Sequence, residues 1–320
     1  MDKIKLEQVR YVYGAGTPFE QVALDGVDLS IKGGCITGII GHTGSGKSTM
    51  MQLLNGLSSP TSGKVFLDGV DIHAKPEEVY EAWKKLPEYQ SLSKRAQKKA
   101  MREKLERNRR NLCFRVGLVM QYPEYQLFEE TVFRDIAFGP SNMGLPKEEI
   151  SARVYEAMEF VGLDRSLSEQ SPFDLSGGQK RRVALAGVIA MRPEVLVLDE
   201  PAAGLDPRGK DQIFERICAY QKSTASTVLI VSHSMEDMAK YCDEIVVMDH
   251  AKVSMKGTCK EIFAQTQVLS QSGLDIPQIT QMMHLLKKAG LPVSENVYTV
   301  EEAIKAVSWA FENGKELEAQ

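Results

Sequence analysis

The chain has 320 residues, 43% of them hydrophobic and 26% charged, and its formal net charge is −4. The length suits one large domain or a domain with an appendage, and the composition is that of an ordinary folded protein. The longest apolar run, residues 183–191, is nine residues long, whereas a membrane-spanning helix needs ~18 or more. The balance of charge lacks the basic footprint of a nucleic-acid-binding protein, so neither a membrane span nor a nucleic-acid partner is expected.

The N-terminus and the cysteines indicate a cytosolic protein. Residues 1–5 lack the apolar core of a signal peptide. The five cysteines form no CxxC pair and are expected to be reduced packing residues. They are Cys35, Cys113, Cys218, Cys242 and Cys259.

The first predicted elements surround a glycine-rich loop. Residues 9–13 alternate as a strand does and end at Tyr13. Residues 35–40 have the pattern of a short buried strand, residues 41–48 are rich in glycine, and residues 48–54 follow as a helix that Asn55-Gly56 would end. Strand, loop and helix in this order are the context that a phosphate-binding loop requires.

Four further apolar runs predict strands of one sheet. They are residues 116–120, 195–198, 227–231 and 245–248, and such continuous runs suit a parallel sheet covered on both faces. Helical stretches lie between them, including residues 132–163 and a helix opened by Ser176. The predicted core is therefore α/β.

The segment between Lys84 and Arg110 is strongly basic. It carries eleven Lys or Arg and three Glu, so its charge is +8 against −12 for the rest of the chain. Residues 96–110 are rich in helix formers and nearly free of apolar residues, which predicts a solvated surface helix. Contact with anionic lipid headgroups or with an acidic partner is the alternative.

The last part of the chain, from about residue 268, predicts a small helical appendage. Ile279, Met282, Met283 and Leu286 recur at helical spacing. Residues 290–292 break this helix, and residues 300–311 begin another.

The glycine-rich loop has the chemistry of a triphosphate site. Backbone N–H groups must point at the phosphates, which requires glycines because side chains would block the approach. Lys47 adds a mobile positive charge for the β- and γ-phosphates, and the Ser48 hydroxyl can ligate Mg²⁺. A structural glycine turn is the plainer alternative. The residues expected to contact ATP are Gly41, His42 through its backbone, Thr43, Gly44, Ser45, Gly46, Lys47, Ser48 and Thr49.

Asp199 and Glu200 follow the apolar run at residues 195–198. Two adjacent carboxylates at a buried strand tip are costly unless something uses them. Asp199 suits the Mg²⁺ shell, and Glu200 suits the attacking water as its general base or orienter. A surface turn after a strand is the plainer alternative here.

The pentapeptide at residues 175–179, Leu-Ser-Gly-Gly-Gln, lies between these two motifs. Bare amides at its helix N-terminus form an anion site. Loop, pentapeptide and acidic strand together resemble the ATP-binding-cassette ATPases, which have a RecA-like P-loop domain with an inserted helical subdomain. In that family the pentapeptide of one subunit caps the ATP held by the loop of another. The resemblance therefore implies a dimer in which Ser176, Gly177, Gly178 and Gln179 contact the ATP of a partner.

The same resemblance implies roles for residues outside the three motifs. Gln121 matches a glutamine that senses Mg²⁺ and water, and His233 matches a switch histidine that hydrogen-bonds the γ-phosphate. Tyr13 matches the aromatic residue that stacks on adenine, with Tyr11 as its alternative, and Asp206 lies in a loop that crosses the dimer interface. The other histidines, His73, His250 and His284, are expected to be ordinary surface or packing residues.

Several stretches narrow the resemblance to the ATP-binding subunits of energy-coupling factor transporters. They are residues 16–20, 41–45, 121–132, 135–140 and 273–277, and the first of them points to the second ATPase subunit of the pair. The resemblance implies an ATPase at the cytoplasmic face of the cell membrane that powers uptake of vitamins or transition-metal ions. Its implied partners are a homologous second ATPase, a transmembrane scaffold and exchangeable substrate-binding membrane proteins. The ATPase of a conventional substrate-specific transporter and a cytosolic mechanical ATPase are the alternatives.

The expected domain organisation follows from these assignments. Residues 1–265 would form the nucleotide-binding domain, with a helical subdomain at about 122–180 and a basic insertion at about 76–111. Residues 268–320 would form a C-terminal helical domain that dimerises. The insertion is a departure from the family pattern, because it places Lys47 and Gln121 74 residues apart.

The segment at residues 122–128 is the predicted coupling surface for the membrane partner. It directly follows Gln121 and offers aromatic anchors for a partner helix that bears arginines. The anchors are Tyr122, Tyr125 and Phe128, and the expected acceptors are Glu124, Glu129 and Glu130. Simple packing of these aromatic residues within the helical subdomain is the alternative.

Overall fold

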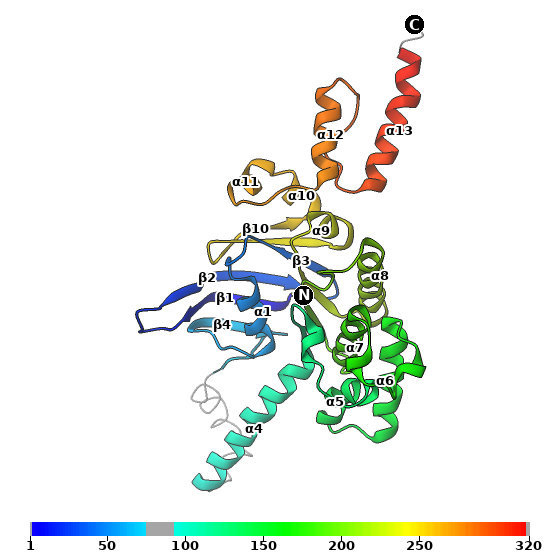
Figure 1. The fold of residues 1–320 in the computed structure, drawn as a ribbon. Coiled ribbons are helices and arrows are strands. Elements are labelled where there is room, and N and C mark those ends of the chain that lie inside the picture. Colours follow the sequence, from blue (N-terminus) through cyan, green and yellow to red (C-terminus); the bar gives the residue numbers. More distant parts are fainter. Residues whose placement is uncertain (1, 75–92, 318–320) are drawn as a thin grey trace.

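The computed structural model describes residues 2–74 and 93–317, which form two sheets, a layer of helices and a helical extension at the C-terminus (Figure 1). Residues 75–92 contain the first part of the basic insertion expected at about 76–111. They lie outside the described residues, as do residues 318–320.

The N-terminal sheet is antiparallel and has the strand order β2-β1-β4-β5. Its strands are β1 (Asp2–Tyr13), β2 (Gln21–Lys32), β4 (Ser62–Leu67) and the short β5 (Val70–Asp71). The strand predicted at residues 9–13 is the last part of β1, whose earlier residues also alternate between exposed and buried positions.

The central sheet has the strand order β10-β9-β3-β8-β7-β6, and only its edge pair β9 and β10 is antiparallel. Five parallel strands correspond to the five apolar runs in the sequence, so the predicted α/β fold is confirmed. The apolar pattern does not predict β10, because its residues alternate between exposed and half-buried positions. The strands are β3 (Ile36–Ile40), β6 (Val116–Val119), β7 (Val195–Asp199), β8 (Thr227–Val231), β9 (Glu244–Asp249) and β10 (Lys252–Thr258).

The side chains of the central sheet alternate between two hydrophobic cores. Val195 and Val197 of β7 pack against the N-terminal sheet and α1 (Lys47–Asn55), whereas Leu196 and Leu198 pack against the other helices. The strands β8 and β9 alternate in the same way. Both faces of the sheet are covered, which explains why its parallel strands are continuous apolar runs in the sequence.

The helical layer covers the face of the central sheet opposite the N-terminal sheet (Figure 1). The stretch predicted as helical at residues 132–163 forms two of these helices, and Ser176 is the N-cap of a third. Short 3₁₀ turns connect them. The elements are η1 (Pro123–Gln126), α5 (Val132–Asn142), α6 (Lys147–Val161), η2 (Arg165–Leu167), η3 (Pro172–Asp174), α7 (Gly177–Ile189), α8 (Pro207–Thr224) and α9 (Met235–Tyr241).

The described part of the basic segment is α4 (Lys94–Arg115), a helix that projects from the body of the molecule (Figure 1). The surface helix predicted at residues 96–110 lies within it. α4 passes into β6 without a loop, because Arg115 ends the helix and Val116 begins the strand. Leu112, in the last turn of α4, packs into the core beside the N-terminal sheet.

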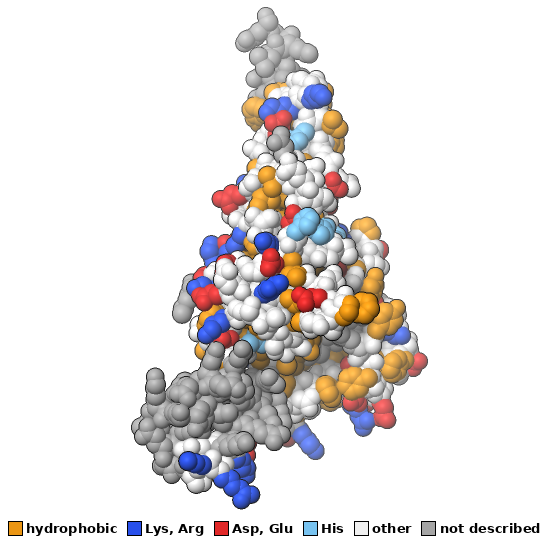
Figure 2. Space-filling model, turned by 90° about the vertical axis from the view of Figure 1, so that its left-hand side faces the viewer, with side chains coloured by type: hydrophobic (Ala, Val, Ile, Leu, Met, Phe, Trp, Pro, Cys, Tyr) orange, Lys and Arg blue, Asp and Glu red, His pale blue; other side chains and the backbone are white. Residues whose placement is uncertain are grey.

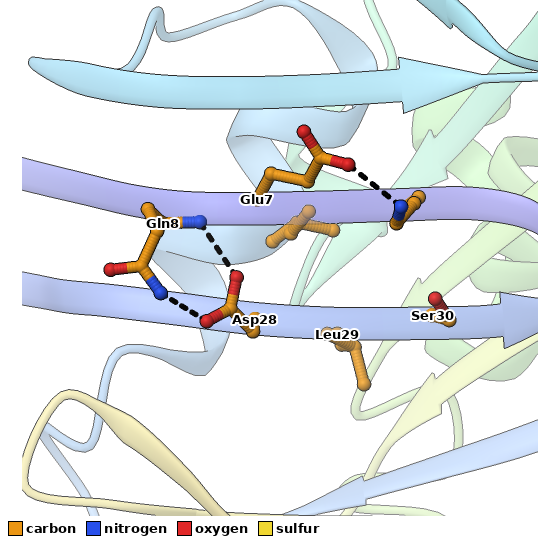
Figure 3. Close-up of a pocket in the computed structure, with 7 residues that line it drawn as sticks. Glu7, Gln8, Asp28, Leu29 and Ser30 are labelled. Atoms are coloured by element: carbon orange, nitrogen blue, oxygen red, sulfur yellow. Dashed lines mark hydrogen bonds and ion pairs between the residues drawn. The ribbon is translucent and has the colours of Figure 1, made fainter.

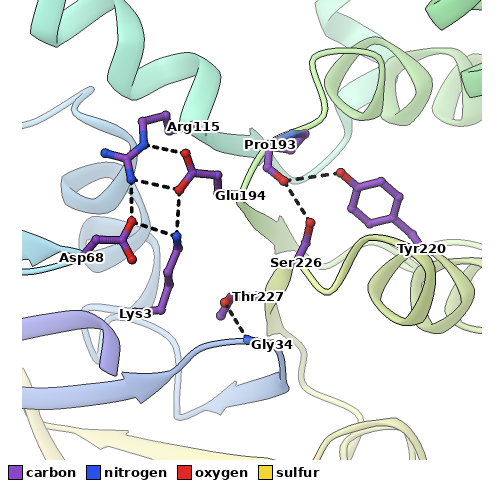
Figure 4. Close-up of polar contacts among 9 residues, drawn as sticks. All are labelled: Lys3, Gly34, Asp68, Arg115, Pro193, Glu194, Tyr220, Ser226 and Thr227. Atoms are coloured by element: carbon purple, nitrogen blue, oxygen red, sulfur yellow. Dashed lines mark hydrogen bonds and ion pairs between the residues drawn. The ribbon is translucent and has the colours of Figure 1, made fainter. Parts of the chain in front are cut away.

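Four charged side chains hold the base of α4 in place, and we refer to Lys3, Asp68, Arg115 and Glu194 as the base clamp (Figure 4). Arg115 donates to Glu194 Oε1 from Nε at 2.8 Å and to Asp68 Oδ2 from Nη2 at 2.5 Å. Lys3 Nζ lies 2.7 Å from Glu194 Oε2 and 2.8 Å from Asp68 Oδ2. The clamp therefore joins β1, the end of β4, the end of α4 and the start of β7.

The C-terminal part of the chain contains α10 (Cys259–Phe263), α11 (Thr266–Gln271), α12 (Gln278–Lys288) and α13 (Val300–Leu317). Leu269, Leu274 and Ile276 still pack into the main core, whereas α12 and α13 share a small core of their own around Met283 and Ala303. All five cysteines are free thiols. None of the helices described here is both long and apolar enough to span a lipid bilayer.

Candidate active site

The glycine-rich loop lies between β3 and α1, with its backbone pressed against neighbouring strands. A Cβ atom at Gly41 would collide with the carbonyl oxygen of Met248, and one at Gly46 with that of Ala23. Gly46 also has φ of 99°, a left-handed conformation that favours glycine. Only glycine fits these two positions, and the loop amides that they leave uncovered can receive an anion at the start of α1.

Lys47 is buried and folds back over the loop that precedes it. Its Nζ donates to the carbonyl oxygens of Gly41 at 2.6 Å and His42 at 2.9 Å. Burial lowers the pKa of Lys47 from its ordinary value, while the nearby carboxylates of Glu200 and Asp199 act in the opposite direction. A phosphate oxygen would be a stronger acceptor for this ammonium group than the two carbonyls.

Ser48 and Asp199 meet at the end of β7. The Ser48 hydroxyl donates to Asp199 Oδ2 at 3.1 Å, so two oxygen atoms from the loop and the strand already lie side by side. Burial raises the pKa of Asp199. Hydroxyl and carboxylate oxygens are the ligands that Mg²⁺ takes in phosphate-binding sites, so the donor set fits this ion.

Glu200 has the unusual environment of a group placed for chemistry. Burial, and after it the negative charge of Asp199, raises the pKa of Glu200 to about 7. Its backbone has φ of 51°, and its Oε1 lies 3.6 Å from Nε2 of His233. A carboxylate with a pKa near neutrality can accept a proton from water and release it again.

The loop, the acidic strand end and four other segments line one cavity of about 400 Å³. This size falls in the range of small-molecule sites. Glu200 Oε1 is buried without a hydrogen-bond partner among the described atoms, and a bound water would satisfy it. The cavity gathers these predicted residues: Tyr13, Thr43, Gly44, Gly46, Lys47, Ser48, Thr49, Gln121, Asp199, Glu200 and His233.

The direction of the side chain distinguishes Tyr13 from Tyr11, the alternative residue for stacking on adenine. Tyr13 lines the cavity, and its hydroxyl lies 3.1 Å from the Thr49 hydroxyl. Tyr11 instead packs against the core beside the N-terminal sheet, and the two rings meet edge to face at 4.8 Å.

The sequence interpretation missed three residues that also line the cavity, which are Gln21, Ala23 and Val231. Gln21 pairs with Tyr13 in the antiparallel register of β1 and β2. Only this pairing brings Gln21 and Ala23 to the cavity, and the strand β2 is not among the predicted elements. Val231 ends β8, two residues before His233, and the end of a strand facing the loop would have been the signal.

The pentapeptide residues are not among those that line the cavity. Ser176 is the N-cap of α7 and forms a capping box with Gln179, in which each side chain accepts from the backbone N–H of the other. Within the part of the chain that the structure describes, a Cβ atom at Gly177 or Gly178 would meet nothing within 4 Å. The amide of Ser176, predicted to be bare, is thus capped by Gln179, and the two glycines face open space.

Asp206 is also outside the cavity and caps the N-terminus of α8. Its side chain accepts from the backbone N–H of Gly209 at 3.1 Å. Gly41, His42 and Ser45 belong to the loop without lining the cavity. The geometry therefore brings together the loop, acidic and switch residues, and leaves the pentapeptide and Asp206 on other surfaces.

The predicted coupling surface differs from expectation at two of its three acids. Glu124 pairs with the buried Arg181 of α7, with Glu124 Oε1 3.0 Å from Nη2. Arg181 also donates to the carbonyl oxygen of Ala203. Glu130 pairs with Arg134 one helical turn away at 2.5 Å. Sequence spacing could not predict the pairing of Glu124, because Arg181 lies 57 residues further along the chain.

A second hollow lies over β1 and β2 and contains none of the predicted site residues (Figure 3). Its polar groups bond to one another: the backbone N–H of Gln8 donates to Asp28 Oδ1 at 2.8 Å, and Lys5 pairs with Glu7 at 2.7 Å. This hollow shows no convergence of groups that would mark it as a second site for a nucleotide.

Comparison with known proteins gives a consistent family. Residues 24–203 match the family described as ABC transporter. The chain is 48% identical over 300 residues to the energy-coupling factor transporter ATP-binding protein EcfA2 of Caldanaerobacter subterraneus subsp. tengcongensis, which covers 94% of each chain. It is 46% identical to the protein of the same name from Clostridium acetobutylicum, over 98% of this chain and 99% of the relative.

Solved structures agree with these relatives. The structure of cbiO1 from Clostridium perfringens, part of the ABC transporter complex cbiONQ, is similar with a TM-score of 0.67 and 35% identity. That likeness covers 88% of this chain and 99% of the other. A dimeric post-hydrolysis state of the ATP-binding cassette MJ0796 bound to ADP and Pi is similar with a TM-score of 0.63 and 25% identity, over 80% and 98% of the two chains.

Proposed function

This chain belongs to the ABC transporter ATPases and, among them, to the ATP-binding subunits of energy-coupling factor transporters, and from this premise we propose how its residues hydrolyse ATP and which surfaces meet its partners. The observation that carries the proposal is the cavity in which six separate segments between Tyr13 and His233 converge. The relatives are named as transporter ATP-binding proteins, and here too the ATP consumed in this cavity drives transport by a membrane complex. Vitamins and transition-metal ions are the cargo classes that we propose.

We assign the residues of the cavity to the parts of a phosphoryl transfer. The loop amides and Lys47 hold the phosphates, and Tyr13 stacks on the adenine. Ser48, Asp199 and Gln121 hold Mg²⁺, which when bound neutralises charge on the phosphates. Glu200 accepts the proton of the attacking water. His233 donates a hydrogen bond to the γ-phosphate as a neutral imidazole, because burial and then the charge of Lys47 lower its pKa.

Lys47→Ala tests the nucleotide assignment directly. The variant should lose nucleotide affinity by at least about tenfold, because a charge-assisted contact of the phosphates is removed. Binding of a fluorescent ATP analogue to the purified chain measures the change, and Lys287→Ala on α12, whose side chain is 51% exposed, is the matched control. Unchanged nucleotide affinity in Lys47→Ala would show that the phosphates do not bind at this loop.

We propose that the pentapeptide serves the ATP of a second cassette ATPase, a homologue of this chain. The argument is that Gly177 and Gly178 face open space at the start of α7 and that the cavity of the same chain does not include them. A heterodimer would then hold two composite sites. Asp206, at the start of α8, would meet the partner across the same interface.

Ser176→Arg separates the two arrangements. The variant should bind ATP normally as an isolated chain and should slow hydrolysis strongly in the assembled complex, because the arginine would fill the space for the partner's γ-phosphate. Ser166→Arg, at an exposed serine of η2, is the control. An equal loss of ATP affinity in the isolated chain and in the complex would mean that the pentapeptide acts on its own nucleotide.

We propose that α12 and α13 form a second contact between the ATPases. Figure 2 shows hydrophobic side chains exposed along the narrow upper part of the molecule that these helices form. Leu285 is 67% exposed and Ile304 is 60% exposed. Leu285→Glu combined with Ile304→Glu should lower the fraction of ATPase pairs measured by sedimentation, and an unchanged fraction would argue that the two helices do not contribute.

The segment at residues 122–128 is our proposed docking surface for a transmembrane scaffold. Tyr125 is 84% exposed and Phe128 is 57% exposed, and Phe128 packs edge to face against Phe138 at 4.9 Å. A neighbouring hollow of about 600 Å³ lies between Glu129, Phe138 and Ile150. Aromatic anchors beside an acidic residue suit a partner helix that bears arginines. The chain would thus sit peripherally at the cytoplasmic face of the membrane.

Tyr125→Ser tests this surface without disturbing the Glu124–Arg181 pair. Substrate uptake in membrane vesicles should fall sharply while nucleotide binding to the isolated chain stays normal. Leu57→Ser, at an apolar residue that follows α1 and is 61% exposed, controls for the loss of an exposed apolar side chain. Normal uptake with the scaffold still bound would contradict the assignment.

A further inference from the structure

Three side chains with metal-ligand chemistry converge where the glycine-rich loop meets the end of β9. They are His42 in the loop, Asp249 at the last position of β9, and His250 in the turn that follows. One ligand atom from each lies within 4.8 Å of the others. Asp249 and His250 are not among the residues lining the ATP cavity, so this cluster is a separate feature on the other side of the loop.

The distances are close to those between ligands of a small tetrahedral ion. Asp249 Oδ1 lies 3.1 Å from Nε2 of His42 and 2.8 Å from Nδ1 of His250. Around an ion with bonds of about 2.05 Å, tetrahedral ligand atoms are about 3.3 Å apart. The two contacts of Asp249 are thus within about half an ångström of this spacing, and the ring nitrogens of the two histidines lie within 4.8 Å of each other.

The contacts of the two ring nitrogens of His42 also point to a ligand. Its Nδ1 lies 2.8 Å from the carbonyl oxygen of Thr43, so Nδ1 carries a proton and donates to it. Nε2 is buried and makes no hydrogen bond with any described group, although a carboxylate oxygen lies near it. Nδ1 is therefore taken by a backbone acceptor, and Nε2 is the ring nitrogen that remains to face Asp249.

The outer contacts are those that orient metal ligands in proteins. A ligating histidine usually donates its second ring N–H to a carbonyl or carboxylate, and a ligating carboxylate is itself hydrogen-bonded. Here Thr43 takes the Nδ1 proton of His42, and the Ser272 hydroxyl donates to Asp249 Oδ2 at 3.1 Å. Nε2 of His42 is thereby left for an ion, beside Oδ1 of Asp249, which contacts Nδ1 of His250 at 2.8 Å.

The backbone fixes this arrangement. His250 and Ala251 have φ of 44° and 64°, so the turn between β9 and β10 is tight and returns the imidazole of His250 toward the loop. The carbonyl of Met248 lies against Gly41, which holds the end of β9 beside the loop. The rings of His42 and His250 meet edge to face at 5.4 Å.

We propose that His42, Asp249 and His250 form a binding site for a divalent transition-metal ion of the Zn²⁺ class. Two imidazole nitrogens and one carboxylate oxygen are ligands that Zn²⁺, Ni²⁺ and Cu²⁺ prefer, whereas Mg²⁺ and Ca²⁺ favour sites made of oxygen atoms. Three protein ligands leave a fourth position for water. Bound metal would tie the glycine-rich loop to the edge of the central sheet. The proposal departs from the expectation that His42 acts only through its backbone and that His250 is an ordinary surface or packing residue.

Zn²⁺ titration of the full chain after chelator treatment tests the site. Competition with a chromophoric chelator should give one ion per chain, unaffected by millimolar Mg²⁺. His250→Ala should weaken binding by at least about tenfold, the scale that lost metal contacts typically produce. His250 is 86% exposed, so this variant should fold, and Asp249→Asn should weaken binding as well. His284→Ala is the matched control and should bind as the parent does.

Co²⁺ in place of Zn²⁺ identifies the ligands independently. The absorption spectrum should be that of nitrogen and oxygen ligands and should disappear in His250→Ala. A sulfur-to-cobalt charge-transfer band would assign the ion to cysteines and overturn the proposal. So would equal Zn²⁺ affinity in the parent and His250→Ala, or no binding at micromolar Zn²⁺, which would leave the cluster as an ion pair between histidine and aspartate.

Discussion

Two glutamates stand at opposite ends of β7 and have opposite chemistry. Glu194 immediately precedes the strand, and hydrogen bonds from Arg115 and then Lys3 hold its pKa to about 2 against partial burial. Glu200 immediately follows the strand, and burial and then Asp199 raise its pKa to about 7. The same residue type flanks the strand at both ends: one carboxyl group is an ion-pair partner, and the other is the group that we propose as the proton acceptor. The direction of the pKa shift depends on whether cations or apolar groups surround the carboxylate.

The largest test of this contrast is the ATPase rate of Glu200→Gln. We expect a rate about 10² to 10³-fold lower, because the amide keeps the shape of the side chain and cannot accept the proton of water. ATP binding should remain near the parental level. Steady-state hydrolysis by the assembled transporter measures the first and equilibrium nucleotide binding measures the second.

Glu194→Gln is the matched variant at the other end of the strand and should hydrolyse ATP at nearly the parental rate per folded molecule. If both variants lost hydrolysis equally, the two ends of β7 would not differ in function. A parental rate in Glu200→Gln would remove the general-base role altogether.

The second test is the pH profile of hydrolysis. Because the pKa of Glu200 is raised to about 7, the carboxyl group is protonated below this pH and cannot act as a base there. The rate should rise about tenfold between pH 6 and pH 8. The pKa of His233 is lowered by burial and then by Lys47, which is the direction opposite to the shift of Glu200. A midpoint near the ordinary glutamate value would contradict the environment described for Glu200.

The third test concerns stability and applies to Glu194. Its folded pKa lies below its ordinary value of 4.5, so its contribution is present above about pH 4.5 and is lost as the pH falls through about 2. Glu194→Gln should lower the free energy of unfolding at pH 7 by about 1 kcal/mol or less, because the side chain is 43% exposed. Denaturant melts at pH 7 and at decreasing pH should show the two proteins converging. A difference that grows on acidification would be the wrong sign.

The smallest expected effect is that of Lys3→Met in the base clamp. Arg115 still bonds to both acids in this variant, so about half of the loss in Glu194→Gln is expected. The same denaturant melts at pH 7 measure it. A loss larger than that of Glu194→Gln would mean that Lys3, and not Glu194, organises the clamp.

Much of the fold and of the cavity follows from local sequence signals. The parallel strands can be predicted from the sequence because both faces of the central sheet are buried, which makes each strand a continuous apolar run. Phosphate and metal chemistry require particular residue types beside a strand end. This requirement predicts the loop residues Lys47 and Ser48 and the acids Asp199 and Glu200.

The remaining features depend on contacts between distant residues. Lys3 and Glu194 are separated by 191 positions and Glu124 and Arg181 by 57, so neither spacing nor periodicity predicts the pairs. Gln21 reaches the cavity only through the register of β1 and β2. His250 lies beside His42 only because a tight turn returns it to the loop, and such a turn is not visible in the spacing of the sequence.

The direct passage of α4 into β6 makes the helix a lever whose fulcrum is the base clamp. The 22 residues of α4 reach about 33 Å at 1.5 Å per residue. The strand β6 leads almost at once to Gln121 in the cavity, so a torque on the far end of α4 would act on that residue. The Arg115–Glu194 pair lies at this junction and, with the rest of the base clamp, ties the end of α4 to the start of β7. The carboxylate before β7 thus anchors the basic helix, whereas the carboxylate after β7 lines the cavity.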